Sequence, residues 1–360
     1  MNPKIKFKIN NQFNAELKKE WAYLADLCHI SVFQSYPWQL AWFENINATV
    51  SRNSVTIISV YFNNNVVAII PFEKKNFLSL NILSLTGFPF ADYCDCLIDK
   101  MFFASNPKIK HEIIEYILNI DNIDLIKIQN IFEDNNIHNL FNKYEFKKSS
   151  FKSYQLYHKN DYEEIIPKKF INDTKRQIRR LKTLGKLSFY IANSDYQKNE
   201  IFNFFIKHKK EQLINTNNWN YLDNKDYINF LKRIYIVDQN HLSCITLNRK
   251  IIAVHMGNLF NKKMFYLFPA YDSSYSKYSP GNILIYELIK ILILQKDNGL
   301  DFTTGDEPYK LKLSNYRTNI LYKNIYLTAK GRIYSIILSF LSIFKKNYYF
   351  KLLYNKIIYR

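Results

Sequence analysis

Hydrophobic residues change their spacing along the chain, from the three-to-four-residue period of helices to the alternating or continuous runs of strands. In the first half, two helical segments precede runs of β-branched and aromatic residues. Asn63, Asn64 and Asn65 separate two of these runs, and asparagine is a common turn residue between the strands of a hairpin. The pattern predicts helices at 16–27, 37–45 and 108–118, and strands at 55–62, 66–72, 80–85, 94–98 and 125–128.

The second half repeats this order with longer helices. Three apolar runs separated by short polar turns predict an antiparallel meander. The predicted helices are 167–184, 198–213, 225–235 and 282–295, and the predicted strands are 241–247, 251–259, 264–270 and 300–303. The sequence therefore predicts an α/β (α+β) fold with one unit used twice, each unit having a mixed, mainly antiparallel sheet flanked by helices. We place the units at 1–155 and 156–330, followed by a basic tail at 331–360.

Length and hydropathy exclude several classes of protein. A chain of 360 residues is about right for two domains. The longest apolar runs are interrupted by charges such as Glu287 and Lys290, or are too short to cross roughly 30 Å of hydrocarbon. The N-terminus lacks the uninterrupted apolar run of a secretory signal. We therefore expect a cytoplasmic protein without a transmembrane helix.

Cysteine and tryptophan positions favour core packing over chemistry. The four cysteines include Cys94 and Cys96 but no second pair at metal-ligand spacing, so neither a zinc site nor any other metal site is expected. In a strand these two thiols would share one face, which is typical of two small buried side chains. Trp38 and Trp42 share one helix face, and core packing is favoured there over a platform for sugar stacking.

The net charge of +19 is concentrated in two places. Residues 168–186 hold eight Lys or Arg against the single acid Asp173, and residues 331–360 hold six and no acid. Such clusters can bind phosphates. However, the whole chain is rich in Lys, Asn, Ile, Tyr and Phe, the residues that AT-rich codons supply, so nucleic-acid binding is not the favoured interpretation.

Several short motifs together resemble one known family. In the first half they are 33–38 (FQSYPW), 41–42 (AW), Gly87, 91–93 (ADY) and Asp95. In the second half they are 176–182 (RQIRRLK), 184–185 (LG), 270–272 (AYD), 278–281 (YSPG), 301–302 (DF) and 305–310 (GDEPYK). Their order and spacing over roughly residues 31–315 resemble the CelD/BcsL-type acyltransferases of the GNAT superfamily. Residues 311–313 depart from the family, which more often has an aromatic residue and a Trp-Gly pair there.

This resemblance implies two tandem GNAT-like units, with the acyl-CoA site in the second. The family is associated with bacterial cellulose and exopolysaccharide biosynthesis and is related to the FemAB/FemX transferases. It implies acetyl-CoA or another acyl-CoA as co-substrate, and a small-molecule or lipid-linked amine, such as an amino sugar, as acceptor.

The turn before the predicted helix 282–295 is the candidate site for the coenzyme A pyrophosphate. Backbone N–H groups at a helix N-terminus attract anions. Gly281 would let the pyrophosphate approach the backbone, Ser279 can cap the helix, Pro280 has no N–H to lose, and Asn282 begins the apolar run. Tyr278, at the start of the same turn, is the remaining residue of the predicted coenzyme A site. An ordinary N-cap with proline in the first turn is the alternative.

Acyl transfer to an amine needs a carboxylate or other base near the amine and an acid for the leaving thiolate. Asp306 is the first candidate for the carboxylate, with Tyr309 as thiolate donor and Lys310 as charge partner. The alternative is that Asp306 caps a turn and Lys310 is solvated. Asp92 is a second carboxylate, and could instead cap a loop. His255 interrupts an apolar strand, where a hydrogen-bonded core residue is favoured over a base.

Two other functions stay open. A FemX-like transferase that uses aminoacyl-tRNA could place residues 168–186 on RNA phosphates. A catalytically silent scaffold of a polysaccharide-synthesis complex could attach through the basic tail. In that tail, Ile333, Ile336 and Phe340 recur at helical spacing. This pattern is typical of a helix lying on an anionic inner membrane, or of a terminal helix docked on the core.

Overall fold

The computed structural model describes residues 5–47, 54–77, 79–88, 90–157, 166–238, 240–294 and 299–343. The chain divides into unit 1, which comprises Met1–Ser150 and Asn319–Arg360, and unit 2, Phe151–Thr318. The first boundary lies close to the predicted residue 155. The second differs from the prediction, because residues 319–330 group with unit 1 together with the tail.

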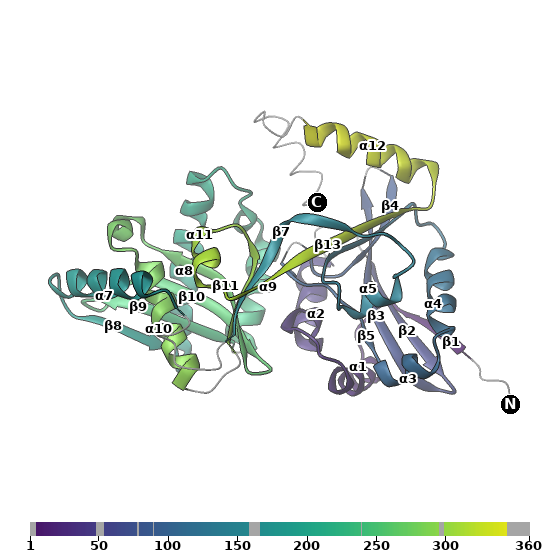
Figure 1. Ribbon diagram of the computed structural model, residues 1–360, viewed down its shortest axis with the longest axis horizontal. Coiled ribbons are helices and arrows are strands. Elements are labelled where there is room, and N and C mark those ends of the chain that lie inside the picture. Colours follow the sequence, from purple (N-terminus) through teal and green to yellow (C-terminus); the bar gives the residue numbers. More distant parts are fainter. Residues whose placement is uncertain are drawn as a thin grey trace. The chain divides into compact units, whose positions relative to one another are not determined.

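Unit 1 combines a sheet with several helices (Figure 1). Its strands are β1 (Ile5–Asn10), β2 (Ser54–Phe62), β3 (Asn65–Phe77), β4 (Leu80–Leu85), β5 (Leu97–Ile98), β6 (Leu125–Ile131) and most of β13 (Tyr316–Tyr326). Its α-helices are α1 (Ala15–Leu27), α2 (Tyr36–Trp42), α3 (Lys100–Ser105), α4 (Ile109–Leu118), α5 (Asn136–Leu140) and α12 (Ala329–Ile343). A 3-10 turn, η1 (Val32–Gln34), precedes α2, and a π-helical turn, η2 (Phe43–Asn47), follows it.

The strand order in unit 1 is β1-β2-β3-β4-β6-β13, with β5 paired to β3. All of these pairs are antiparallel except β4 with β6. The β2–β3 hairpin confirms the predicted turn, because Asn63 and Asn64 both have positive φ, of 49° and 68°. Two consecutive residues of positive φ are what a tight hairpin turn requires.

The core of unit 1 forms where α1 and α2 pack on the sheet. Trp21 of α1 is fully buried among β2, β3 and β5. Trp38 and Trp42 are 3% and 1% exposed with parallel rings 5.9 Å apart, which confirms their predicted packing role. Cys94 and Cys96 are both buried free thiols, but they precede β5 and do not share a strand as predicted.

Unit 2 repeats the arrangement with longer helices. Its strands are β7 (Lys147–Leu156), which begins in unit 1, β8 (Leu187–Ile191), β9 (His241–Leu247), β10 (Lys250–Phe260), β11 (Lys263–Tyr271) and β12 (Gly299–Gly305). Its α-helices are α7 (Lys168–Lys182), α8 (Asp195–Asn215), α9 (Lys225–Lys232), α10 (Pro280–Leu294) and α11 (Pro308–Leu313). Short helical turns are η3 (Tyr221–Asp223), η4 (Arg233–Val237) and η5 (Ser273–Tyr278).

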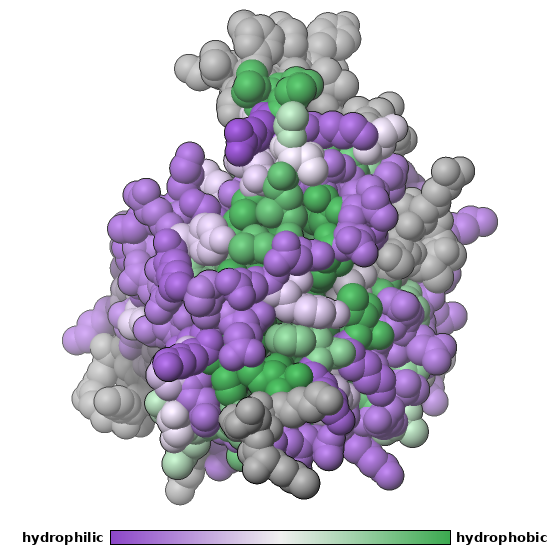
Figure 2. All heavy atoms as spheres, turned by 90° about the vertical axis from the view of Figure 1, so that its right-hand side faces the viewer, coloured by the Kyte–Doolittle hydropathy of each residue, from purple (hydrophilic) through white to green (hydrophobic). Residues whose placement is uncertain are grey.

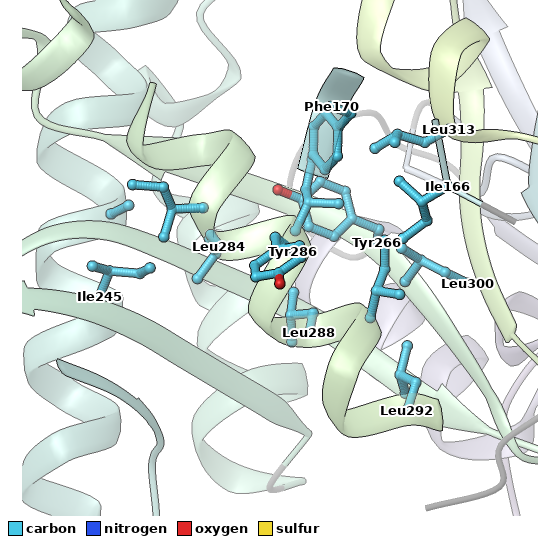
Figure 3. Packing of buried hydrophobic residues seen from close by; sticks show 14 of the residues in the cluster. Ile166, Phe170, Ile245, Tyr266, Leu284, Tyr286, Leu288, Leu292, Leu300 and Leu313 are labelled. Carbon is cyan, nitrogen blue, oxygen red and sulfur yellow. The ribbon is translucent and has the colours of Figure 1, made fainter. Parts of the chain in front are cut away.

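The strand order in unit 2 is β7-β12-β11-β10-β9-β8, and β11 with β12 is its parallel pair. Helices α7 and α10 pack together on one face, where Phe170, Leu284, Leu288, Tyr266 and other side chains form one buried cluster (Figure 3). Helix α8 covers the other face, where the Phe205 ring lies 5.9 Å from that of Phe268. None of the described helices is both long enough and apolar enough to cross a bilayer.

Candidate functional site

The parallel strands β11 and β12 of unit 2 pair over only three residues each. Lys263 to Phe265 pair with Gly299 to Asp301, and neither strand pairs with the other beyond that point. A left-handed residue, Thr303 (φ 59°), and a shift in the pairing of β12 with β7 lie where the strands separate. Ligands of open α/β sheets bind at the carboxyl ends of the strands. The printed parallel pairing therefore ends at Phe265 of β11 and Asp301 of β12.

Helix α10 begins at the same edge. Ser279 adopts the left-handed conformation (φ 50°, ψ 54°), which is uncommon outside glycine, and its carbonyl accepts the N–H groups of Asn282 and Ile283 at 3.0 and 3.3 Å. Pro280 is the first helical residue and has no N–H. Among these described first-turn groups this leaves the N–H of Gly281, which has no carbonyl one turn earlier, and the helix dipole places positive potential there. The start of α10 therefore suits an anion.

A cavity of about 640 Å³ opens beside this helix start. Its walls come from α7, the first turn of α10 and α11. The lining residues are Pro167, Lys169, Phe170, Asp173, Thr174, Arg176, Gln177, Ser279, Asn282, Pro308, Tyr309 and Lys312. They include three cations and one acid, Asp173, which pairs with Arg176 at 3.1 Å. The cavity thus has a positive rim.

Aromatic side chains form the inner wall of this cavity. The ring of Tyr309 lies 5.9 Å from that of Phe302 and 6.2 Å from that of Tyr266, which joins the cavity wall to the hydrophobic core. Phe170 of α7 belongs to the same cluster (Figure 3). A positive rim above an aromatic wall suits a ligand with an anionic end and a less polar end.

The predicted pyrophosphate residues are only partly brought to the cavity. Ser279 and Asn282 line it. Pro280 is buried, and the ring of Tyr278 lies under the Arg180 guanidinium at 5.0 Å. Gly281 lies in the first turn of α10 but does not line the cavity: a Cβ added there would have Tyr271 Cδ1 as its nearest neighbour, at 4.0 Å.

Tyr309, Lys310 and Asp306 have different surroundings. Tyr309 lines the cavity, whereas Asp306 is exposed after the end of β12. Lys310 is only 4% exposed, and its Nζ donates to the Thr304 carbonyl at 2.5 Å and pairs with Glu307 at 3.0 Å. The alternative interpretation of Lys310 as a solvated side chain was therefore wrong.

Lys209 of α8 is close enough to Glu307 and Lys310 to interact with their charges, although the sequence did not predict this. Burial lowers the pKa of Lys209 to about 8, the Glu307 carboxylate opposes that shift, and the charge of Lys310 adds to it. The sequence offers no pattern that links a lysine in the middle of α8 to residues after β12, because only the folded sheet brings them together.

His255 and Asp92 are not at the cavity. His255 is fully buried, with its ring stacked on Tyr266 at 4.3 Å, and neither ring nitrogen has a hydrogen-bond partner. Burial, reinforced by His241, holds the pKa of His255 well below its usual range, so the ring is neutral. Asp92 lies in unit 1, whereas the cavity is within unit 2. In the described part of the chain, no three His, Cys, Asp or Glu side chains come together as a metal site would need.

A family of known proteins matches most of unit 2. Residues 168–311 match the family model described as "Acetyltransferase (GNAT) domain", and this range includes every lining residue except Pro167 and Lys312. No curated protein matches the chain.

Solved structures resemble the chain along most of its length. The crystal structure of FemX covers 93% of this chain and 99% of its own, with a TM-score of 0.60 at 10% identity. L-PGS from Bacillus licheniformis covers 89% and 94%, with a TM-score of 0.53 at 10% identity. A tandem GNAT protein from the clavulanic acid biosynthesis pathway covers 90% and 99%, with a TM-score of 0.51 at 8% identity. The chain therefore has the fold of tandem GNAT proteins, and its second unit carries the match to a GNAT acetyltransferase domain, which supports an acyltransferase.

Proposed function

We propose that the chain is an acyl-CoA-dependent N-acyltransferase of the CelD/BcsL type, which moves an acyl group from a coenzyme A thioester to an amine. The observation that carries the proposal is the cavity of unit 2, which combines a helix N-terminus, three cations and an aromatic wall. Coenzyme A has phosphates at one end and a long, uncharged arm that ends in the thioester. The cavity offers complementary surfaces for both.

In this proposal the first turn of α10 holds the pyrophosphate. Lys169, Arg176 and Lys312 then neutralise phosphate charge at the rim. The uncharged arm lies against the aromatic wall, where Phe170 and Tyr309 line the cavity. This orientation directs the thioester away from the rim, towards the end of β12.

The chemistry requires few side chains. The amine nitrogen attacks the thioester carbonyl, the carbon–sulfur bond breaks, the amine loses a proton to a base, and the thiolate gains one. Tyr309 is the candidate acid for the thiolate, because it lines the cavity. Asp306, exposed after the end of β12, would orient the amine and accept its proton.

The acceptor that we favour is an amino sugar or another amine-bearing precursor of the cell envelope. This part rests on the motif resemblance alone. A second donor, aminoacyl-tRNA, is favoured by one observation. The solvent face of α7 is strongly basic, with Lys168, Lys175, Arg179 and Lys182 among its exposed residues, and so could follow an RNA backbone.

Binding measurements separate these donors. Acetyl-CoA and free CoA should raise the melting temperature of the protein, and aminoacyl-tRNA should not. Arg176→Gln, which removes a cavity cation, should weaken acetyl-CoA binding roughly ten-fold or more in a calorimetric titration, as expected for a lost charged hydrogen bond.

Lys182→Gln is the matched control, because Lys182 is exposed on the same helix but does not line the cavity. It should leave acetyl-CoA affinity unchanged. Stabilisation by aminoacyl-tRNA that both substitutions weaken would favour the tRNA donor. The absence of a response to any donor would reject the transferase proposal in favour of a scaffold.

A further inference from the structure

Helix α12 carries side chains of contrasting exposure on its two sides. Tyr334 is 9% exposed and packs with Leu80, Ile82 and Leu125 at the start of β4 and β6. The Lys127 ammonium lies 5.4 Å above the same ring. This contact docks the helix on unit 1, as one of the two interpretations of the tail predicted.

In the part of α12 whose side chains the structure describes, the opposite side is apolar and exposed. Ile333, Ile336 and Ile337 are 57%, 69% and 49% exposed. Their spacing of three and four residues places them on one helix face. Hydrophobic side chains are visible at the surface at the top of Figure 2, where Figure 1 shows α12. Grouped exposed apolar residues of this kind mark a surface that binds something.

The charged residues of α12 itself are all positive. At about 100° per residue, Lys330 and Arg332 flank the three isoleucines, and both are exposed. The sequence of α12 contains no acidic residue, and the following residues 344–360 add five Lys or Arg and no acid. We define the α12 face as these three isoleucines with Lys330 and Arg332.

We propose that the α12 face binds an anionic lipid surface, with the isoleucines in the interfacial region and the cations at the headgroups. The positive charge of the α12 face favours an anionic lipid surface as its partner. Lysine and arginine can place their aliphatic stems beside apolar groups while their charged ends reach phosphates. A second copy of the chain would instead bring two cationic faces together, which is unfavourable. The proposal does not depend on the donor or acceptor proposed above.

Vesicle flotation tests this binding with the full chain. The protein should float with vesicles of phosphatidylcholine and phosphatidylglycerol, remain below with phosphatidylcholine alone, and lose binding in high salt, which screens the charges. The triple substitution Ile333→Ser, Ile336→Ser and Ile337→Ser should lower the partition coefficient about ten-fold or more, because it removes the apolar anchor.

A matched control removes exposed apolar residues elsewhere in unit 1. Tyr23, Leu27 and Met101 are 52%, 46% and 83% exposed, and their replacement by serine should leave flotation unchanged. Equal flotation of the α12 triple variant would overturn the proposal, as would a wild-type chain that never floats. A concentration-dependent dimer that the α12 triple variant abolishes, without flotation, would assign the face to a second copy.

Discussion

Gly281 does not line the cavity, but it lies in the first turn of α10 next to the lining residue Asn282, so a side chain added there should change stability and donor binding in opposite directions. Its φ is not in the left-handed region, and an added Cβ would have its nearest neighbour at 4.0 Å, which is ordinary van der Waals contact. Gly281→Ala should therefore stabilise unit 2 by about 0.5–1 kcal/mol, because alanine reduces the entropy of the unfolded chain. For a unit of this size, that is a rise of roughly 1–4 °C in melting temperature.

Binding of the donor should change in the opposite direction. A pyrophosphate held by the first turn of α10 must approach the backbone closely, and a side chain at Gly281 would hold it away. Loss of one charged hydrogen bond costs about 1.5–3 kcal/mol, so Gly281→Val should weaken acetyl-CoA binding by roughly 10- to 100-fold, and Gly281→Ala by less.

Thermal melting and calorimetric titration measure the two effects on the same samples. Gly87→Ala is the contrasting control. Gly87 has a φ of +103°, and an added Cβ would lie 2.7 Å from atoms of Ala91 and Trp38, so this change should destabilise unit 1. Wild-type affinity in both Gly281 variants would refute the assignment of the pyrophosphate to this turn.

Three further predictions concern the end of β12 and the buried histidines. Asp306→Asn should lower turnover roughly 100-fold with little change in melting temperature, because Asp306 is exposed; wild-type turnover would remove Asp306 from the mechanism. Lys310→Met should lower stability by about 1–3 kcal/mol, because it removes a buried donor to the Thr304 carbonyl; an unchanged urea midpoint would contradict this. Burial lowers the pKa of His241 to about 4. An unfolded histidine titrates near 6.5, so the contribution of His241 to the free energy of unfolding should be complete above about pH 6.5. It should be lost as the pH falls towards 4, by up to about 1.4 kcal/mol per pH unit. His241→Gln should flatten that dependence in urea unfolding, and an identical slope would show that other groups cause it.

Local patterns predicted the elements whose determinants are close together in sequence. The asparagines of the β2–β3 turn and the apolar stripe of α1 specify their own geometry. Elements that depend on distant partners were missed. β1 pairs with β2 and β13 pairs with β6, and these pairings with distant segments, not a local pattern, define them as strands. The predicted strand 94–98 shrank to β5, because the backbone carbonyls of Cys94 and Cys96 accept the side-chain amides of Asn135 and Asn136 instead of pairing with a neighbouring strand.

In the candidate site, too, only the residues whose determinants are close together in sequence could be predicted. Ser279 and Asn282 could be predicted because a helix start is local, and Tyr309 because a motif carries it. The cations at the rim lie on α7, far away in sequence, and nothing in the charge pattern of that helix distinguishes Arg176 from Lys182. The environment of Lys310 depends on the Thr304 carbonyl, whose direction is set by the irregular end of β12.

The return of the chain to unit 1 after residue 318 has a consequence for synthesis. Unit 2 is continuous in sequence, so β8 to β12 are synthesised before β13, the last strand of unit 1. Until β13 emerges, β6 lacks the antiparallel partner that pairs with it from Leu321 to Tyr326. An unpaired strand edge is prone to association with other chains. The second unit can thus complete its fold before the first, and a fragment ending near residue 150 should aggregate during expression, whereas one spanning 151–318 should remain in solution.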